Sequence, residues 1–341
     1  MVNATMMPME PLTIDGPHGD VSLLSDDWRE RLCEAAHATG RQEGVFGETT
    51  GEGGNYRPRP VKLRWHGGQA PYEVDIDGHR YECVEPCLDV YYLQTGKEVV
   101  WTVTDGSGVS VAGRFFTAHG SRLIQMPNRE YGPVNVRDVG GWPWRLAGRS
   151  GWLRQGLLYR GSAINEWLPA CEENNAFLVG TLGVKTDMDL RYADVVACKT
   201  HSDLEDSLAW LCHPINAYES FTSEQNVIWR DAIARFADSS LYPIYFHCSG
   251  GVDRTGELAF LLQGLCGVLQ ENLFLDYELS SLAGFPRLRS IPYLQHWMQE
   301  LQAFAPLGSS WAEIIKCYML EIGVTRKQIN SIRQILMEQD V

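Results

Sequence analysis

One short stretch of the sequence limits the possible fold of this chain more than any other. It is FHCSGGVDRTGEL, at residues 246–258. The run YPIYF at 242–246 is rich in β formers and predicts a buried strand. The segment from Arg254 onward predicts a helix whose apolar face carries Leu258, Leu261, Leu262 and Leu265. A glycine-containing loop therefore joins the end of a strand to the start of a helix, which is typical of α/β folds.

A loop in this position is suited to bind a phosphate group. The first backbone N–H groups of a helix lack intrahelical partners and carry the positive end of the helix dipole. Gly250, Gly251 and Gly256 allow the backbone to curl so that successive N–H groups face inward. We therefore expect a phosphate-binding loop formed by Ser249, Gly250, Gly251, Val252, Asp253 and Arg254.

The same loop begins with a thiol. A helix N-terminus and a nearby guanidinium favour the thiolate form of a cysteine, which is the nucleophilic form. We expect Cys248 to be the nucleophile and Arg254 to bind two phosphoryl oxygens through its planar fork. Thr255 is placed to donate a hydrogen bond to the thiolate, and His247 to hold the strand end and tune the sulfur.

A leaving alcohol also needs a proton. Asp253 lies within the loop and is the first candidate for the general acid. Asp189 and Asp194 are rivals, because they lie near the end of another predicted strand, and the strand ends of such sheets meet at one edge.

The loop and three further segments resemble a known family. HCSGGVDRTG is similar to the H-C-x5-R-[ST] signature of the protein tyrosine phosphatase superfamily of cysteine-dependent phosphatases. The segments NVRDVGGWP at 135–143, GLLYRG at 156–161 and LGVKTDMDLR at 182–191 resemble, in the same order, motifs of the bacterial atypical tyrosine phosphatases. The resemblance covers roughly residues 121–341.

The resemblance implies a cysteinyl-phosphate mechanism that needs no metal and no cofactor. It assigns Cys248 as nucleophile, Arg254 as phosphate clamp and the amides of 249–254 as the phosphate cradle. It favours Asp253 as proton donor, with Asp189 as the competing assignment. Val252 stands where many bacterial relatives carry Lys. The absence of this cation disfavours multiply phosphorylated substrates.

The pattern of the chain predicts three parts. Residues 1–58 form an N-terminal extension with one helix near 25–40. Residues 59–120 read as short strands separated by turns, which predicts an all-β sandwich with Trp65 and Trp101 in its core. This module is similar to a fibronectin type III domain and is expected to do no chemistry.

Residues 121–341 alternate short apolar strands with longer helical patterns, which predicts an α/β phosphatase domain with a central, mostly parallel sheet flanked by helices. One helix is expected over 164–183. Another begins with a capping signature made by Thr325 and Gln328. Arg137 and Asp138 are interpreted as a buried ion pair that supports the fold.

Composition limits the partners. A net charge of −14 disfavours nucleic acids and anionic membranes, and no apolar run is long enough to span a bilayer. No signal peptide is recognisable, so a cytoplasmic location is expected. The nine cysteines lack the spacing of a zinc site, and most are interpreted as buried, reduced thiols.

Together these observations predict a phosphomonoester hydrolase, with phosphotyrosine in a protein or another small phosphomonoester as substrate. Inositol phosphates or phosphoinositides are the alternative substrates. Their binding would require several Lys or Arg side chains near the loop, and the candidates for these cations are Arg287 and Arg289. A catalytically inactive phosphate-binding module is a second alternative, and a sulfur-transfer or arsenate-reducing enzyme a third. The oligomeric state stays open.

Overall fold

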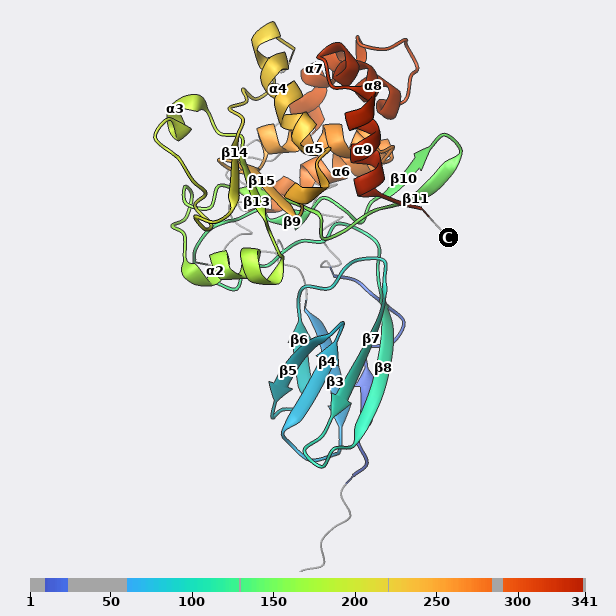
Figure 1. Ribbon diagram of the computed structural model, residues 1–341. Coiled ribbons are helices and arrows are strands. Elements are labelled where there is room, and N and C mark those ends of the chain that lie inside the picture. Colours follow the sequence, from blue (N-terminus) through green and yellow to red (C-terminus); the bar gives the residue numbers. More distant parts are fainter. Residues whose placement is uncertain (1–9, 24–59, 129, 220, 284–290, 340–341) are drawn as a thin grey trace, which may run out of the picture. The chain divides into compact units, whose positions relative to one another are not determined.

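The computed structural model describes residues 10–23, 60–128, 130–219, 221–283 and 291–339 (Figure 1). These residues form two compact units, one ending at Gly120 and the other beginning at Ser121.

The first unit is a β-sandwich. Within its described residues, one sheet has the order β1-β3-β6 and the other the order β2-β8-β7-β4-β5. All neighbouring strands are antiparallel except the short pair β2 and β8. The strands are β1 (Thr13–Gly16), β2 (Asp20–Val21), β3 (Val61–His66), β4 (Tyr72–Ile76), β5 (His79–Cys83), β6 (Cys87–Val90), β7 (Glu98–Thr104) and β8 (Ser110–Thr117).

The core of this sandwich packs aliphatic side chains around the two tryptophans that the sequence predicts there. Side chains alternate between buried and exposed along β3, which is the period of a strand with one face against a core. Trp65 and Trp101 are both almost completely buried, with ring centroids 6.1 Å apart, and Tyr72 packs edge-on against Trp65 at 5.4 Å. The predicted role of both tryptophans in the core is confirmed.

Two strands of the sandwich come from the segment that the sequence analysis assigned to an extension. Thr13–Gly16 pairs with β3, and Asp20–Val21 pairs with β8. Both strands are short, so their sequence carries little periodicity from which to predict them. The helix predicted near 25–40 lies outside the described residues.

The second unit is built on a sheet of order β14-β13-β15-β12-β9 in its described part. Four strands are parallel, and β9 pairs antiparallel with β12, which matches the expected α/β fold. The strands are β9 (Arg137–Asp138), β12 (Leu158–Ser162), β13 (Thr186–Asp189), β14 (Ala209–Cys212) and β15 (Ile244–Cys248). The parallel strands end in register, so Ser162 pairs with Cys248 and Asp189 pairs with both His247 and Cys212. Side chains from four segments therefore meet at this edge.

Helices cover the sheet, with α4 to α9 gathered on one side of it in Figure 1 and α2 on the other. The central helix α5 packs against β12, β15, α6 and α8. The helices are α2 (Glu172–Ala176), the π-helix η1 (Phe177–Thr181), α3 (Ala193–Val196), α4 (Ser223–Arg235), the 3-10 helix η2 (Ser239–Leu241), α5 (Asp253–Leu265), α6 (Gln270–Glu278), the 3-10 helix η3 (Leu279–Ala283), α7 (Ile291–Gln302), α8 (Trp311–Glu321) and α9 (Arg326–Leu336).

A small antiparallel sheet completes the described part of this unit. It has the order β10-β11-β16, with β10 (Pro143–Leu146), β11 (Arg149–Leu153) and β16 (Met337–Gln339). The helix before β16 begins with the predicted capping box, in which Thr325 and Gln328 bond each other's backbone, so this prediction is confirmed.

Two helix predictions differ from the structure. The expected helix over 164–183 begins only at Glu172, because Pro169 cannot donate the hydrogen bond that a helix interior needs. Helix α5 is buried on nearly all sides rather than on one leucine face, since it is enclosed by the sheet, α6 and α8.

The predicted burial of most cysteines is wrong. Of the eight cysteines among the described residues, only Cys248 and Cys266 are buried, while Cys87 and Cys198 are exposed. The apolar run around Cys212 forms the edge strand β14, which leaves that thiol partly exposed. All eight are free thiols.

Candidate active site

The signature stretch folds as a strand, a tight loop and a helix. Cys248 is the last residue of β15, and α5 begins at Asp253. We call residues 248–254 the cysteine loop. Only 2% of Cys248 is exposed, so the thiol is buried at the carboxyl edge of the sheet.

Donors outside the cysteine loop bind its carbonyl oxygens. The Ala163 amide donates to the carbonyl of Ser249 at 3.1 Å. The side-chain Nδ2 of Asn135 donates to the carbonyl oxygens of Gly250 at 3.2 Å and Gly251 at 3.0 Å. Arg160 Nη2 donates to the carbonyl of Gly251 at 3.0 Å. The carbonyls of residues 249–251 are therefore bound by donors from other segments of the domain.

A buried ion network holds these donors in place. Asp276 of α6 binds Arg137 Nε at 3.2 Å and Arg160 Nη1 at 2.6 Å, and Arg137 Nη1 donates to Asn135 Oδ1 at 2.7 Å. Burial alone raises the pKa of Asp276, but the charges of Arg137 and Arg160 lower it below its ordinary value. The pKa of Arg160 falls to about 10, because burial and Arg137 disfavour its charge more than Asp276 and Cys248 favour it.

The predicted ion pair between Arg137 and Asp138 does not form. Both side chains are buried, but Asp138 binds Arg122 at 3.2 Å, while Arg137 binds Asp276. Consecutive residues of a strand point to opposite faces, so neighbours on β9 meet different partners.

The glycines of the loop act in different ways. Gly251 has a φ of +67°, and a Cβ there would lie 2.1 Å from the carbonyl oxygen of Gly161. Gly256 lies inside α5, where a Cβ would meet the ring of Tyr277 at 2.9 Å. Of the three glycines, Gly251 supplies the left-handed turn, while Gly256 makes room for helix α6.

Arg254 folds back across the cysteine loop. Its Nη2 donates to Ser249 Oγ at 3.3 Å and its Nη1 to the carbonyl of Leu190 at 3.4 Å. The ring of Tyr192 lies over the guanidinium, with its centroid 4.1 Å from Cζ. Tyr192 is 42% exposed, so an aromatic ring stands between this cation and solvent.

Asp253 is the first residue of α5 and is half-buried. Its Oδ1 accepts a hydrogen bond from the Tyr218 hydroxyl at 2.5 Å, and that hydroxyl lies 2.7 Å from the hydroxyl of Tyr277. Burial, Tyr277 and Asp253 all raise the pKa of Tyr218, so its hydroxyl keeps its proton and donates.

His247 is held by a carboxylate. Its Nε2 lies 2.9 Å from Asp187 Oδ1, and its Nδ1 lies 4.0 Å from Asp189 Oδ1. Burial alone lowers the pKa of His247, but the charges of Asp187 and Asp189 raise it above the ordinary value. The expected bond from Thr255 to the thiolate is absent, since the buried Thr255 hydroxyl has no hydrogen-bond partner among the described residues.

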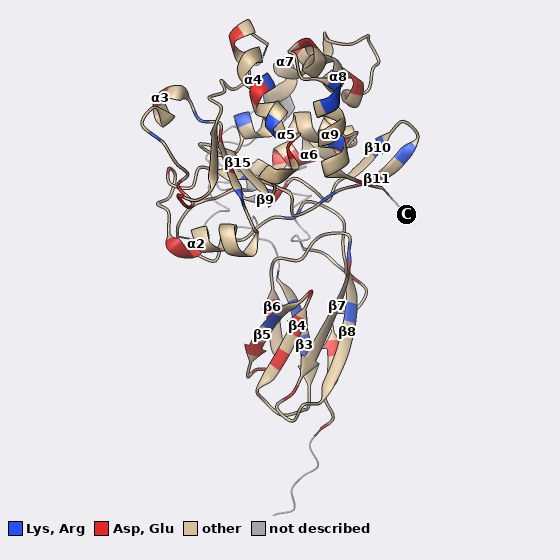
Figure 2. Ribbon diagram, in the orientation of Figure 1, with Lys and Arg blue, Asp and Glu red and all other residues tan. Residues whose placement is uncertain are grey.

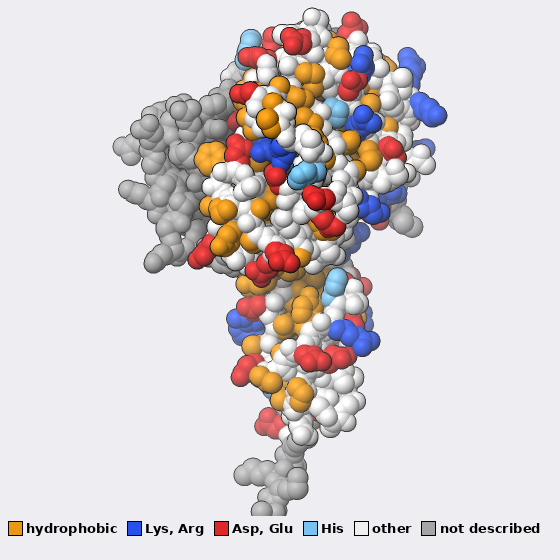
Figure 3. All heavy atoms as spheres, turned by 60° about the vertical axis from the view of Figure 1, so that its left-hand side comes forward, with side chains coloured by type: hydrophobic (Ala, Val, Ile, Leu, Met, Phe, Trp, Pro, Cys, Tyr) orange, Lys and Arg blue, Asp and Glu red, His pale blue; other side chains and the backbone are white. Residues whose placement is uncertain are grey.

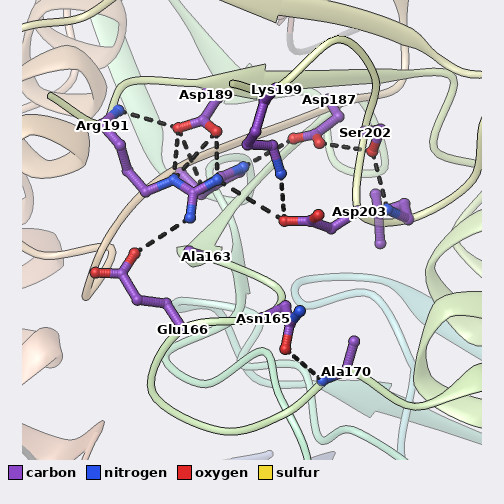
Figure 4. A network of polar contacts seen from close by, with 12 residues as sticks. Ala163, Asn165, Glu166, Ala170, Asp187, Asp189, Arg191, Lys199, Ser202 and Asp203 are labelled. Carbon is purple, nitrogen blue, oxygen red and sulfur yellow. Dashed lines mark hydrogen bonds and ion pairs between the residues drawn. The ribbon is translucent and has the colours of Figure 1, made fainter. Parts of the chain in front are cut away.

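Asp189 belongs to a second ion network, shown in Figure 4. Arg191 binds Asp189 through Nε and Nη2, the latter at 2.6 Å, and contacts Glu166 at 3.3 Å and Asp203 at 3.8 Å. Burial alone raises the pKa of Asp189, but His247 and Arg191 lower it. This carboxylate is fully buried and stays ionised.

The remaining candidates lie elsewhere. Asp194 is exposed in the first turn of α3, where its carboxylate accepts from the amide of Val195. Arg287 and Arg289 lie outside the described residues. Within the described ranges, no three His, Cys, Asp or Glu side chains are arranged to hold a metal ion.

Several site residues carry roles that sequence reasoning missed. Asn135 and Arg160 lie in the two glycine-containing segments at 135–143 and 156–161, and a polar side chain in such a segment is a usable signal for a residue that supports the loop. Asp276, Tyr218 and Tyr192 stand in no motif, and only the fold brings them to the cysteine loop.

Charged side chains of both signs are scattered over the elements in Figure 2, and they intermingle on the face seen in Figure 3. Among the described helices, none has both the length and the apolar character needed to cross a membrane.

Chemically, the cysteine loop combines a buried thiol with an arginine, a helix N-terminus and a half-buried carboxyl group. Backbone amides and a guanidinium are groups that can bind the oxygens of a tetrahedral anion, and a thiolate is a nucleophile.

Two solved structures resemble the fold weakly, each with a TM-score of 0.31. The core catalytic domain of the PP-IP phosphatase SIW14 from S. cerevisiae, in complex with citrate, is 18% identical over 43% of this chain and 83% of that one. Another structure of the Siw14 catalytic core is 17% identical over 48% of this chain and 86% of that one. Likenesses this weak carry no information on substrate.

No curated protein matches the sequence. Residues 131–338 match the tyrosine phosphatase family, and the matched segment contains β9, the cysteine loop, both ion networks and helix α9. With more than half of its length matched, the chain belongs to the tyrosine phosphatase family of cysteine-based phosphatases.

Proposed function

We propose that the protein hydrolyses phosphomonoesters through a cysteinyl-phosphate at Cys248. The observation that carries this is the binding of the loop carbonyls by Ala163, Asn135 and Arg160, which leaves the opposite, amide side of the loop for the phosphoryl oxygens. The guanidinium of Arg254 makes long hydrogen bonds to Ser249 Oγ at 3.3 Å and to the carbonyl of Leu190 at 3.4 Å. It would exchange these two bonds for bonds to two phosphoryl oxygens.

The reaction proceeds in two displacements. The thiolate of Cys248 attacks phosphorus, the bond from phosphorus to the ester oxygen breaks, and the leaving oxygen takes a proton from Asp253. A water molecule then attacks phosphorus, gives its proton back to Asp253 and displaces the sulfur as thiolate, so that inorganic phosphate leaves.

Asp253 is the better candidate for the general acid. It is half-buried within the cysteine loop and bound to a neutral hydroxyl. Asp189 is fully buried and bound to Arg191 by several hydrogen bonds, which favour its ionised form. A carboxylate fixed in this way is a poor source of a proton.

Phosphotyrosine is the proposed substrate class. Support comes from the Tyr192 ring over Arg254, which offers an aromatic surface beside the phosphate site. Inositol phosphates need additional cations, but Arg137, Arg160 and Arg191 are each committed to buried carboxylates. Val252 is also apolar.

We further propose that the β-sandwich is a fibronectin type III-like accessory module. Its two mostly antiparallel sheets and its tryptophan core support this assignment. Its part would be to bind a partner or guide substrate, and no chemistry is assigned to it.

The deciding experiment measures phosphate released from phosphotyrosine peptides, inositol phosphates and nucleotides by the wild type and by Cys248→Ser. We expect turnover of the tyrosine peptides only, and none by the variant. Preferred hydrolysis of inositol phosphates would replace the proposed substrate, whereas binding of phosphotyrosine without turnover would indicate an inactive binding module.

The acid is tested separately with Asp253→Asn and Asp189→Asn. Loss of the acid should slow alkyl phosphates by about 10²- to 10⁴-fold and p-nitrophenyl phosphate much less, because a good leaving group needs little protonation. We expect this difference for Asp253→Asn. The same pattern in Asp189→Asn alone would move the role to Asp189.

A further inference from the structure

We propose that Tyr218, on the loop between β14 and α4, is a positioning residue that aims the carboxyl group of Asp253 at the leaving-group oxygen. This inference rests on the proposed role of Asp253 as general acid. Its starting point is the hydrogen bond of 2.5 Å from the Tyr218 hydroxyl to Asp253 Oδ1.

The backbone at Tyr218 is held in an unusual conformation. Its φ is +60°, in the left-handed region that non-glycine residues seldom occupy. The Tyr218 amide donates to Oε1 of the fully buried Glu257 at 2.8 Å. Asp253 and Glu257 are four residues apart on α5 and therefore share one face of the helix. Helix α5 thus binds Tyr218 twice, through its main chain and through its hydroxyl.

The loop on either side of Tyr218 is also anchored. The Asn216 amide donates to Gln225 Oε1 of α4 at 2.9 Å. The ring of Phe221 packs against those of Trp297, Phe304 and Tyr318, with centroids 5.4 to 6.0 Å apart. With anchors before and after it, the tyrosine is fixed relative to α5, as a positioning residue must be.

The Tyr277 hydroxyl extends this arrangement. It lies 2.7 Å from the Tyr218 hydroxyl, and α6, which carries it, also supplies Asp276 to the network beneath the cysteine loop. Tyr277 holds the Tyr218 oxygen in place, and the two hydroxyls with Asp253 form one chain of hydrogen bonds. Removing either hydroxyl should therefore act in the same direction.

The hydrogen bond at Oδ1 assigns the transferred proton to Oδ2. As the phosphorus–oxygen bond breaks, this proton moves to the leaving oxygen, which keeps the electron pair of that bond. Without Tyr218 the carboxyl group can rotate away from the leaving group. Proton donation should suffer, while binding of the phosphate by the loop amides and Arg254 should not.

The test compares Tyr218→Phe with the wild type on aryl phosphates of graded leaving-group pKa. The variant keeps the ring and the backbone and removes only the hydroxyl. We expect kcat/KM, which reports the step that expels the leaving group, to fall about 10- to 100-fold for phenyl phosphate, as for loss of a hydrogen bond to the carboxylate that Asp253 becomes when it gives up its proton. The fall should be small for p-nitrophenyl phosphate, and the affinity for vanadate should be unchanged. Tyr242→Phe is the matched control, since its buried hydroxyl donates to Phe236 O at 2.7 Å, away from the cysteine loop.

A double mutant separates this inference from the role of Asp253. If Tyr218 acts through Asp253, then Tyr218→Phe should change kcat/KM for phenyl phosphate little in an Asp253→Asn background. Equal losses for all leaving groups, or full additivity with Asp253→Asn, would overturn the inference while leaving Asp253 as the acid. An Asp253→Asn variant without leaving-group dependence would overturn the proposed acid itself. Should Tyr218→Phe fail to fold, Tyr277→Phe must show the same dependence in weaker form.

Discussion

His247 Nε2 lies 2.9 Å from Asp187 Oδ1, and both side chains are almost completely buried. His247 directly precedes the proposed nucleophile Cys248 in the chain. Ser202 donates to the other carboxylate oxygen of Asp187 at 2.6 Å. Asp187 lies on β13, beside the strand β15 that carries the histidine, and its carboxylate favours the protonated form of His247.

This pair predicts a pH dependence of stability. The pKa of His247 is raised in the folded chain, mainly by Asp187 and Asp189 against the effect of burial. Between the ordinary histidine pKa of about 6.5 and the higher folded value, the folded chain binds more protons than the unfolded chain, so the free energy of unfolding falls as pH rises. The stabilisation is complete below pH of about 6.5 and lost above the folded pKa.

Urea unfolding from pH 6 to pH 9 measures this slope. Asp187→Asn removes the charge and should flatten the slope across that window. Ser202→Ala is the control, because it removes a hydrogen bond to Asp187 while keeping the ion pair, and should keep the slope. An Asp187→Asn variant with the wild-type slope would assign the effect to another group.

The parts of the site that sequence could predict are those made by local chain. The strand, loop and helix around Cys248 follow from one continuous segment, residues 242–265, and the family motifs occur in the same order along the chain. The supports of the loop are not local: Asn135 binds Gly251 116 residues away, and Arg137 binds Asp276 139 residues away. Such partners are set by strand order and helix packing.

The errors have the same origin. Arg137 and Asp138 are adjacent in sequence, which favours pairing them, but a strand sends them to opposite faces. The apolar neighbours of Cys212 favour a buried thiol, but β14 lies at the edge of the sheet and leaves it partly exposed. Tyr218 reaches Asp253 through a left-handed turn that its own sequence, without glycine, does not signal.

A methyl group at Gly251 should disrupt the cysteine loop. Gly251→Ala places a Cβ 2.1 Å from the carbonyl of Gly161 at a φ of +67°. The clash is with backbone, so the loop must move away from β12 and lose the bond from Arg160. We expect loss of vanadate binding by calorimetry. Gly148→Ala, at a φ of +76° but with open space around it, is the control for backbone strain alone and should keep binding.

Breaking the ion network under the loop should destabilise the domain. Asp276→Asn leaves Arg137 and Arg160 as buried, uncompensated charges, at a cost of about 3–5 kcal/mol in the free energy of unfolding. Chemical denaturation measures the loss. Because the pKa of Asp276 is lowered in the folded chain, its contribution is present above the ordinary carboxyl pKa and disappears as pH falls through the folded value. The variant should therefore show a weaker acid-induced loss of stability than the wild type.

The ring of Tyr192 should act on substrate binding rather than on chemistry. It covers the guanidinium of Arg254 at 4.1 Å and is 42% exposed, so it can contact an aryl group attached to the bound phosphate. A cation–π contact at a partly exposed site contributes about 0.5–1 kcal/mol, and an aromatic contact with substrate a similar amount. Tyr192→Leu should therefore raise KM for a phosphotyrosine peptide about 3- to 10-fold, with kcat nearly unchanged. Tyr192→Phe keeps the ring and should retain the wild-type KM. If Tyr192→Leu raised KM equally for an alkyl phosphate, the ring would serve only to hold Arg254, and its contact with the aryl group would be excluded.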